Sequence, residues 1–575
     1  MCGGSLTCAL SMEEVCTADC IIYRGALDIR KCIRIMSALL AAVNSVFLTL
    51  FYASMPTAGA FLIPYIVMLV VGGMPLLYLE LAIGQHYRSG CISIWRYICP
   101  LLKGVGFGIC LILLYMNFYY NTIISLAMYY LMASFQPELP WTHCNHTWNT
   151  DSCSPGAYDS AEEYYFRQVL GIHQSSGIDD LGAPRWQLVC GLAVVYVVTY
   201  FALWKGPKSL GKAAWITGVV PFIVLLILLI HGLTLEGSYH GLQYFLYPQW
   251  DRLLPVEVWS DAAAQVFFSL GPGYGVYMAL ASYNPLHNNA FRDAVLTSLV
   301  NLIFSFVSGL VVFSILGYQA HVSGRDLREV VTDGPGLVFV ALPTAVSTMP
   351  GAQFWSAIFF LMLITLGLDS TLYGLEAILT AVSDEYPVRL GKHRKLFCFG
   401  LCMLCFLCSL PSTTSGGQYV VTLLDFFGPT IACTFLVLVE IAAFCFLYVK
   451  SRKLHDISRM MSSKPGLIWM ICWTGIGPSF VVATVFLMTL FHYSPLTLGN
   501  YEFPAWSIAL GWALTFSSIL CISGYIVVAL LTGNGALRIK LRKLIRPEAF
   551  ITETRESVAL QKKKCQDPET NPVRF

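Results

Sequence analysis

The sequence is poor in charge. Of its 575 residues only 12% are Asp, Glu, Lys or Arg, whereas 56% are hydrophobic, and the mean hydropathy is +0.66. Soluble proteins carry about 25% charged residues. Half that share over so long a chain excludes an ordinary soluble protein and indicates that most of the chain lies in a lipid bilayer.

The sequence also lacks the patterns of an enzyme. We find no metal-ligand histidine spacing, nucleophile elbow or phosphate loop placed to form a catalytic site, so we expect no enzymatic activity. Residues 1–30 contain no apolar run typical of a cleaved signal. The formal net charge is only +2, and we expect no nucleic-acid partner. Most of the 20 cysteines lie in apolar runs, where free cysteine acts as a small hydrophobe.

Apolar runs near or above the ~20 residues needed to span a bilayer recur along the chain. They cover 33–55, 60–81, 104–135, 187–203, 213–231, 261–283, 295–320, 353–381, 397–410, 419–449, 468–491 and 506–531. These runs predict an all-α integral membrane protein of about twelve transmembrane helices. The predicted organisation is a cytoplasmic segment 1–32, a transmembrane domain 33–531 and a cytoplasmic tail 532–575.

Lysine and arginine are distributed unevenly among the connecting loops. They are frequent in 82–103, 204–212, 389–395, 450–464 and the tail after 537, and absent from 411–418 and 492–505. Because basic loops stay cytoplasmic, this pattern places both termini inside and the loop 136–186 outside.

The loop 136–186 carries further signs of an extracellular position. It contains the sequon Asn145-His146-Thr147 between Cys144 and Cys153. We expect a glycan on Asn145 and a disulfide between the two cysteines, both of which need the outer side of the membrane. Two unpaired cysteines are the alternative.

One acidic residue lies deep within an apolar run. Asp369, in Leu366-Gly367-Leu368-Asp369-Ser370-Thr371, is ten or more residues from either end of its run. Ionisable groups at membrane depth are costly and indicate a function. A carboxylate beside two hydroxyls offers oxygen ligands to a small cation. The alternative is a protonated aspartate that hydrogen-bonds to a neighbouring helix.

Glycine and proline interrupt the run 261–283. Gly271-Pro272-Gly273-Tyr274-Gly275 places three glycines around one proline, which predicts a broken helix. Unwound backbone at membrane depth is tolerated only inside protein or along a cavity, and secondary transporters bind substrates and ions there. A simple proline kink is the alternative.

Two polar pairs at helical spacing accompany the break. Gln265 and Ser269 share one helix face, and so do Asn301 and Ser305. Such neutral groups could coordinate sodium or hold an anion, although Ser and Asn also join membrane helices to one another. Nearby aromatic residues could hold an organic cation; they are Tyr115, Tyr119, Tyr120, Phe267, Phe268 and Tyr274.

Six short segments stand out between Gly59 and about residue 548: 59–65 (GAFLIPY), 72–76 (GGMPL), 80–85 (ELAIGQ), 139–142 (LPWT), 268–273 (FSLGPG) and 363–371 (LITLGLDST). In these segments the sequence resembles the neurotransmitter:sodium symporter family, in its monoamine branch. It implies an inverted-repeat transporter fold with a broken sixth helix. It also implies sodium- and chloride-coupled symport of a monoamine at the plasma membrane, with serotonin favoured over dopamine and a homo-oligomer as a further expectation.

The resemblance also implies roles for individual residues. One sodium site would use the Leu366 carbonyl, Asp369 and Ser370, and the other Ser269 and Asn301. Chloride would bind to Tyr65, Gln265, Ser269 and Ser305. The amine would contact Met116, Tyr120, Phe268, Tyr274, Thr371 and Gly374, and Asp384 would serve as a cytoplasmic gate.

The first predicted helix departs from the family. Relatives read close to Asp-Leu-Gly-Asn-Val-Trp-Arg-Phe-Pro-Tyr there, whereas 33–58 contains no Asp and no Gly. Losing a buried charge partner costs about 2–5 kcal/mol of binding. Two hypotheses stay open. The first is a symporter whose N-terminal sequence is mispredicted or alternatively spliced. The second is a non-transporting relative that acts as an assembly partner or regulator.

Overall fold

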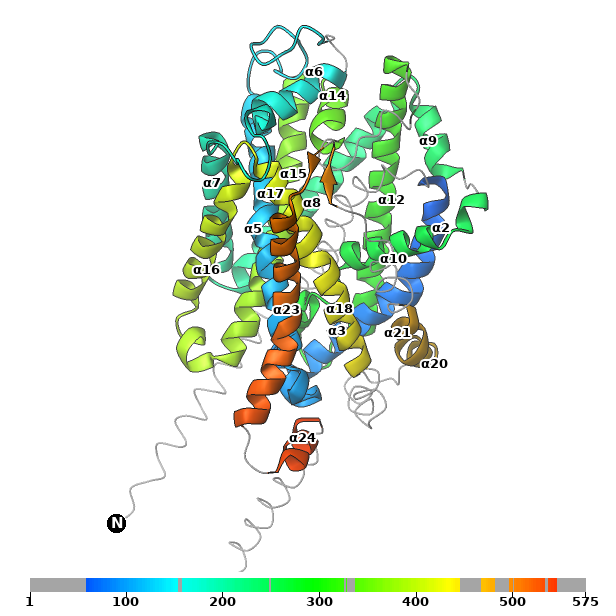
Figure 1. Ribbon diagram of the computed structural model, residues 1–575. Helices are drawn as coiled ribbons and strands as arrows, with labels where there is room; N and C mark the ends of the chain where they lie inside the picture. The colour runs from blue at the N-terminus through cyan, green and yellow to red at the C-terminus, as the bar shows by residue number, and fades with distance from the viewer. Residues whose placement is uncertain are drawn as a thin grey trace, which may run out of the picture.

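The computed structural model describes residues 58–153, 158–247, 250–324, 327, 337–444, 467–480, 496–499, 501–532 and 536–545. The predicted segment 1–32, the atypical first helix at 33–55 and most of the tail 532–575 lie outside these residues. Where the chain is described it is almost entirely helical (Figure 1).

The helices follow one another with short connections. The first third contains α2 (Ala58–Met68), η1 (Leu69–Gly73), α3 (Met74–Tyr87), α4 (Trp95–Ile98), η2 (Pro100–Leu102), α5 (Gly104–Ala133), α6 (Tyr158–Glu163), η3 (Tyr164–Leu170), η4 (Ile172–Gln174) and α7 (Trp186–Leu203). The middle contains α8 (Pro207–Thr234), α9 (Ser238–Leu246), η5 (Trp250–Leu253), α10 (Val256–Leu270), α11 (Val276–Ser282), α12 (Ala290–Ser323), η6 (Leu337–Ala341), α14 (Leu342–Val346) and α15 (Ala352–Glu385).

The last third has shorter pieces. It contains η7 (Pro387–Gly391), α16 (Arg394–Ser409), η8 (Leu410–Thr413), α17 (Gly417–Asp425), η9 (Phe426–Thr430), α18 (Ile431–Ala443), α20 (Leu467–Ile471), η11 (Cys472–Ile476), α21 (Gly477–Phe480), β1 (Thr497–Leu498), β2 (Tyr501–Glu502), α23 (Ala505–Thr532) and α24 (Leu537–Ile545).

The described helices match ten of the twelve predicted spans. Nine of them are long and apolar enough to cross a membrane, within the part of the chain that the structure describes. The run 261–283 adds a tenth span, divided into α10 and α11 by the predicted break. The runs 33–55 and 468–491 complete the twelve; the first lies outside the described residues and the second is described only to residue 480.

The structure differs from the all-α prediction in one small element. β1 and β2 pair antiparallel, with Thr497 opposite Glu502 and Leu498 opposite Tyr501. The turn uses Gly499 at φ +57°, a conformation that glycine adopts without steric penalty. Two-residue strands are too short to show an alternating pattern, so periodicity could not predict them.

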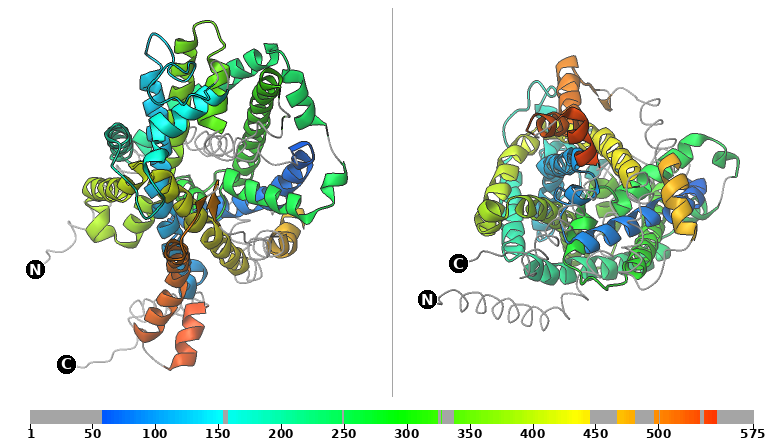
Figure 2. Two further views of the ribbon diagram at one scale, coloured as in Figure 1. Left: turned by 45° about the horizontal axis from the view of Figure 1, so that its top comes forward. Right: turned by 90° about the horizontal axis from the view of Figure 1, so that it is seen from below.

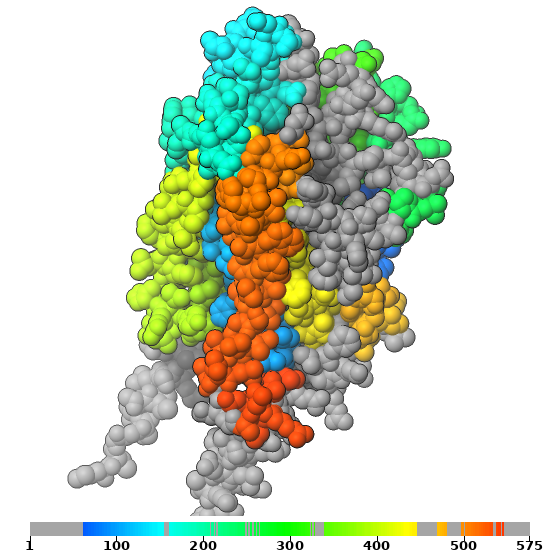
Figure 3. All heavy atoms as spheres, viewed as in Figure 1, coloured from blue at the N-terminus to red at the C-terminus, as the bar shows by residue number. Residues whose placement is uncertain are grey.

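Two long helices form the centre of the bundle. α5 and α15 pack along each other, with α7 and α16 on one side; on the other side α8 packs against α15, and α12 and then α9 follow beyond α8 (Figures 1 and 2). At their contact Gly367 lies so close to α5 that an added Cβ would be 2.5 Å from Ile124 Cγ1. By contrast, α23 runs over the outer face, and only 11% of its most apolar window is buried (Figure 3).

The hydrophobic core has two large parts, stacked along the helices, and a small third cluster around Tyr419, Leu423 and Phe427. α15 contributes Leu363 and Leu366 to one cluster and Leu372 and Leu375 to the other. α5 and α12 divide in the same way, at about residues 114–123 and 295–303. Buried polar side chains occupy this boundary: Asn117, Asn121, Asn301 and Asp369. The fold therefore places these four polar groups at one level between two apolar halves.

Close glycine contacts hold α9 against α12, which predicts a sensitive position. A Cβ on Gly241 would lie 1.8 Å from the Phe313 carbonyl oxygen. Gly241→Ala should therefore lower the thermal stability, because backbone must move and overpacking costs about 1–3 kcal/mol. The control is Gly400→Ala, whose added Cβ meets nothing within 4 Å. A melting temperature unchanged in both variants would refute this tight contact.

Candidate functional site

The sixth span breaks where the sequence predicted. α10 ends at Gly271 (φ +72°), and the chain passes through Gly273 (φ +87°) and Gly275 (φ +67°) before α11 begins. Side chains satisfy the exposed backbone: Tyr277 Oη donates to the Leu270 carbonyl at 2.6 Å, and the Gly273 N–H donates to Glu80 Oε1. The interruption is a full break rather than a proline kink, and its polar backbone is paired inside the protein.

Asp369 lies at mid-length of α15 and is completely buried. Its Oδ1 accepts a hydrogen bond from Thr217 Oγ1 of α8 at 2.7 Å, whereas Oδ2 has no hydrogen-bond partner. The neighbouring Ser370 hydrogen-bonds with Tyr120 of α5. Leu366 lies one turn earlier on the same unbroken helix and is also buried. The predicted first sodium set therefore presents one carboxylate oxygen that is free to accept a cation.

A second buried polar cluster joins α2, α10 and α12. Ser269 Oγ donates to Asn301 Oδ1 at 2.9 Å, and Asn301 Nδ2 donates to Tyr65 Oη at 3.2 Å. Tyr65 Oη also lies 3.0 Å from Ser305 Oγ and hydrogen-bonds with Ser269. Gln265, one turn before Ser269, is 2% exposed and its Oε1 lacks a partner. The structure thus brings together the residues predicted for the second sodium site and for chloride.

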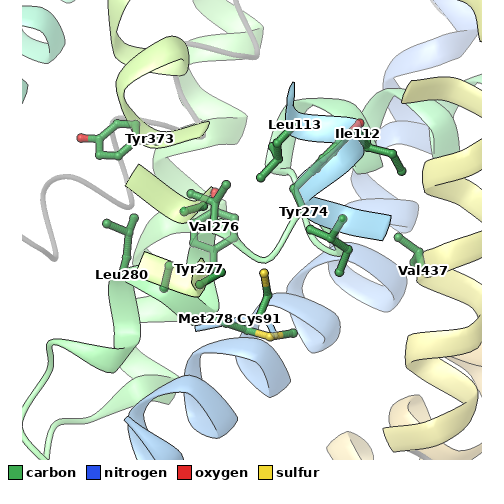
Figure 4. Packing of buried hydrophobic residues seen from close by; sticks show 14 of the residues in the cluster. Cys91, Ile112, Leu113, Tyr274, Val276, Tyr277, Met278, Leu280, Tyr373 and Val437 are labelled. Carbon is green, nitrogen blue, oxygen red and sulfur yellow. The ribbon is translucent and has the colours of Figure 1, made fainter. Parts of the chain in front are cut away.

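The predicted amine contacts come from three helices and the break. Met116 and Tyr120 of α5 and Phe268 of α10 are half-buried. Tyr274 hydrogen-bonds with Cys433, and Figure 4 shows it between Leu113 of α5 and Val437 of α18.

Two of the predicted amine contacts face α5 instead. Thr371 Oγ1 donates to Asn121 Oδ1 at 2.7 Å. An added Cβ on Gly374 would lie 3.4 Å from Asn117 Nδ2. In this conformation both positions contribute to the contact between α5 and α15.

Sequence reasoning missed the polar network around Asn121. Asn121 Nδ2 donates to Tyr196 Oη at 3.0 Å, and Tyr196 Oη donates to the Asn117 carbonyl at 2.8 Å. The same hydroxyl lies 3.1 Å from Ser409 Oγ. The network ties α5, α7, α15 and α16 together at the boundary between the two cores. An asparagine in the middle of an apolar run was the available signal.

The predicted gate residue Asp384 lies near the C-terminal end of α15. Its Oδ2 accepts a hydrogen bond from the Gly90 N–H at 2.8 Å, which fixes the loop after α3. Three ion pairs that the sequence did not indicate accompany it. Glu376 pairs with Arg394 at 2.6 Å, and Glu385 with Arg96 at 2.7 Å and with Lys103. These ion pairs link α15 to α16, to α4 and to the start of α5.

The loop 136–186 contains the predicted disulfide between Cys144 and Cys153. Asn145, the predicted glycan acceptor, is exposed beside it. Thr150 N–H and Asn149 Nδ2 each donate to Glu163 Oε2 at 3.0 Å, which links the loop to α6. Covalent and polar contacts together order this loop.

Glu163 should make the disulfide loop sensitive to acid. Burial raises the pKa of Glu163, but hydrogen bonds from Thr150 and Asn149 and the charge of Arg167 together lower the pKa below its usual value. Because the folded pKa is lowered, the stabilisation is complete above the ordinary glutamate pKa and is lost as the pH falls through the lowered value. The protection of the Thr150 amide against hydrogen exchange, corrected for the intrinsic exchange rate at each pH, should fall only in acid in the wild type, and already at neutral pH in Glu163→Gln. Equal exchange in both proteins would contradict this.

The broken helix and the buried polar clusters define the class: a helical membrane transporter with its binding groups at mid-depth. The model of the sodium:neurotransmitter symporter family matches residues 48–533. The sodium-dependent serotonin transporter of Drosophila melanogaster is 48% identical over 499 residues, which cover 85% of this chain and 80% of that protein. The sodium-dependent dopamine transporter of Bos taurus is 44% identical over 503 residues, 85% of this chain and 72% of that protein.

The chain belongs to the sodium:neurotransmitter symporter family, in the branch that contains these two transporters. The resemblance predicted from its motifs is confirmed, and so is the helical membrane fold of inverted repeats. Its relatives are transporters rather than enzymes.

Proposed function

We propose that the protein is a sodium- and chloride-coupled symporter that carries a monoamine across the plasma membrane. The observation that carries this proposal is Asp369, a fully buried carboxylate with one oxygen free of hydrogen bonds. A buried charge without a partner is expensive, and a small cation with oxygen ligands compensates it. Sodium is the cation to which the family is coupled.

The second polar cluster suits two further ions. In the proposed second sodium site, a cation between Ser269 Oγ and Asn301 Oδ1 replaces the hydrogen bond that now joins them. The hydroxyls of Tyr65, Ser269 and Ser305 and the Gln265 amide are neutral donors, which is the chemistry that an anion needs. We assign chloride to this group.

The proposed amine site lies around the broken helix. Met116, Tyr120, Phe268, Tyr274, Thr371 and Gly374 are its proposed contacts, and aromatic faces attract organic cations. Asp384 is the proposed cytoplasmic gate, both termini are placed in the cytoplasm, and Asn145 is placed outside. The higher identity to a serotonin transporter than to a dopamine transporter, over nearly equal lengths, favours serotonin.

The test is uptake of labelled serotonin and dopamine by cells that display this chain at their surface. We expect uptake that requires sodium, is reduced when chloride is replaced by gluconate, and is faster for serotonin. Cells without the protein provide the background. Surface protein without sodium-dependent uptake of either amine would overturn the proposal and support a non-transporting partner or regulator.

A further inference from the structure

A second buried acidic site lies beside the broken helix, apart from the proposed sodium ligands. A small cavity of about 10 Å³ separates α3 from α18, with the unwound segment as its third wall. Its lining includes Glu80 of α3, Pro272 and Gly273 of the break, and Val437 and Glu440 of α18. Figure 4 shows Val437 on α18 facing the segment that carries Tyr274.

The two carboxyl groups are almost without hydrogen bonds. Glu80 is 4% exposed; its Oε1 accepts from the Gly273 N–H and its Oε2 has no partner. Glu440 is 2% exposed, and neither of its oxygens has a partner. Three of the four carboxylate oxygens of these two residues at the cavity therefore accept no hydrogen bond.

Both groups cannot be ionised in this setting. Two like charges in a low-dielectric interior strongly oppose each other, and one of them takes up a proton instead. No lysine or arginine forms an ion pair with either acid in the part of the chain that the structure describes. The negative charge of the pair must therefore be reduced by a proton that one of the two acids binds.

The neighbouring titratable groups do not supply that charge. Tyr277 uses its hydroxyl on the Leu270 carbonyl, and the Cys91 thiol lies 3.8 Å from the Cys110 thiol. Cys433, on the same helix as Glu440, hydrogen-bonds with Tyr274. All of these groups are neutral when protonated. None of them supplies a positive charge to offset the two acids, so the proton must be held by the acids themselves.

We infer that Glu80 and Glu440 form a proton-binding site, in which Glu440 carries the proton and Glu80 is ionised. The hydrogen bonds decide the order. Glu80 accepts from a backbone N–H, which favours its charged form, whereas no donor reaches Glu440. Because Gly273 belongs to the unwound segment, the charge of this pair acts directly on the backbone that divides the sixth span. The inference does not require that the chain transport an amine.

Infrared spectroscopy of the full-length protein in lipid nanodiscs tests the assignment. The wild type should show the carbonyl band of a protonated carboxylic acid at neutral pH, with the usual shift in heavy water. Glu440→Gln should lose one such band, whereas the exposed Glu502→Gln should keep it. A band that is unchanged in Glu440→Gln would overturn the inference.

A second variant keeps the test decisive if Glu440→Gln does not accumulate. Glu80→Gln removes the neighbouring negative charge, so Glu440 should lose its proton at a pH about one unit lower than in the wild type. An unchanged midpoint would overturn the pairing of the two acids. Spectra in sodium, potassium and choline salts provide the remaining comparison: a band that disappears when an alkali cation replaces choline would assign the site to that cation instead.

Discussion

Asp369→Asn should abolish most sodium-dependent amine uptake while the protein still folds and reaches the surface. Asparagine keeps the shape of the side chain, and its Oδ1 can still accept the hydrogen bond from Thr217. What it loses is the charge that compensates the cation. Truncating one member of a buried charge pair costs about 2–5 kcal/mol, roughly 30-fold to several-thousand-fold in affinity. Uptake measured against sodium concentration gives this loss directly.

Two matched variants separate the charge from its surroundings. Thr217→Val removes the hydrogen bond to Oδ1, which contributes about 1 kcal/mol, together with the contact of the same hydroxyl with the Ala213 carbonyl, and should raise the sodium requirement less than tenfold. Asp151→Asn removes a carboxylate from the exposed loop and should change nothing. If Asp369→Asn took up amine with the sodium dependence of the wild type, Asp369 would be a buried acid of structural importance only, and the proposed function would lose its main support.

The parts of the fold that were predictable follow local chemistry. Apolar runs predict spans because a bilayer admits little else, and the nine long helices lie where those runs do. The break at Gly271–Gly275 was predictable because proline and glycine act on their own backbone. The ends of the helices were predicted less exactly. α8 begins at Pro207, inside the segment 204–212 that was predicted to be a loop from its lysines, because proline suits the first turn of a helix.

What the sequence could not predict are contacts between distant residues. Gly367 stands next to the predicted sodium ligands in the sequence, but in the structure it makes room for Ile124. Thr371 has the polarity of a ligand-binding residue, yet its hydroxyl bonds to Asn121, 250 positions away in the chain. Nothing in the sequence around Glu80 indicates that its partner is the Gly273 amide. Each of these depends on which helices become neighbours, and a single sequence does not contain that information.

The break in the sixth span should be intolerant of a single added methyl group. Gly273 has φ +87°, and a Cβ there would lie 2.1 Å from Val437 Cγ2. Gly273→Ala should therefore suffer twice, from a backbone conformation that costs about 1–2 kcal/mol for other residues and from overpacking of about 1–3 kcal/mol. We expect a lower melting temperature and loss of uptake.

Comparison with a neighbouring glycine separates these two effects. Gly271 also has a positive φ, but its added Cβ would meet only ordinary contacts, the nearest at 3.8 Å. Gly271→Ala should therefore lose only the backbone contribution. Val437→Ala provides the space that Gly273→Ala lacks. The double variant should therefore be more stable than the sum of the two single-variant losses predicts. Strict additivity would mean that α18 does not restrain the break, and the unwound segment would then owe its shape to its own glycines alone.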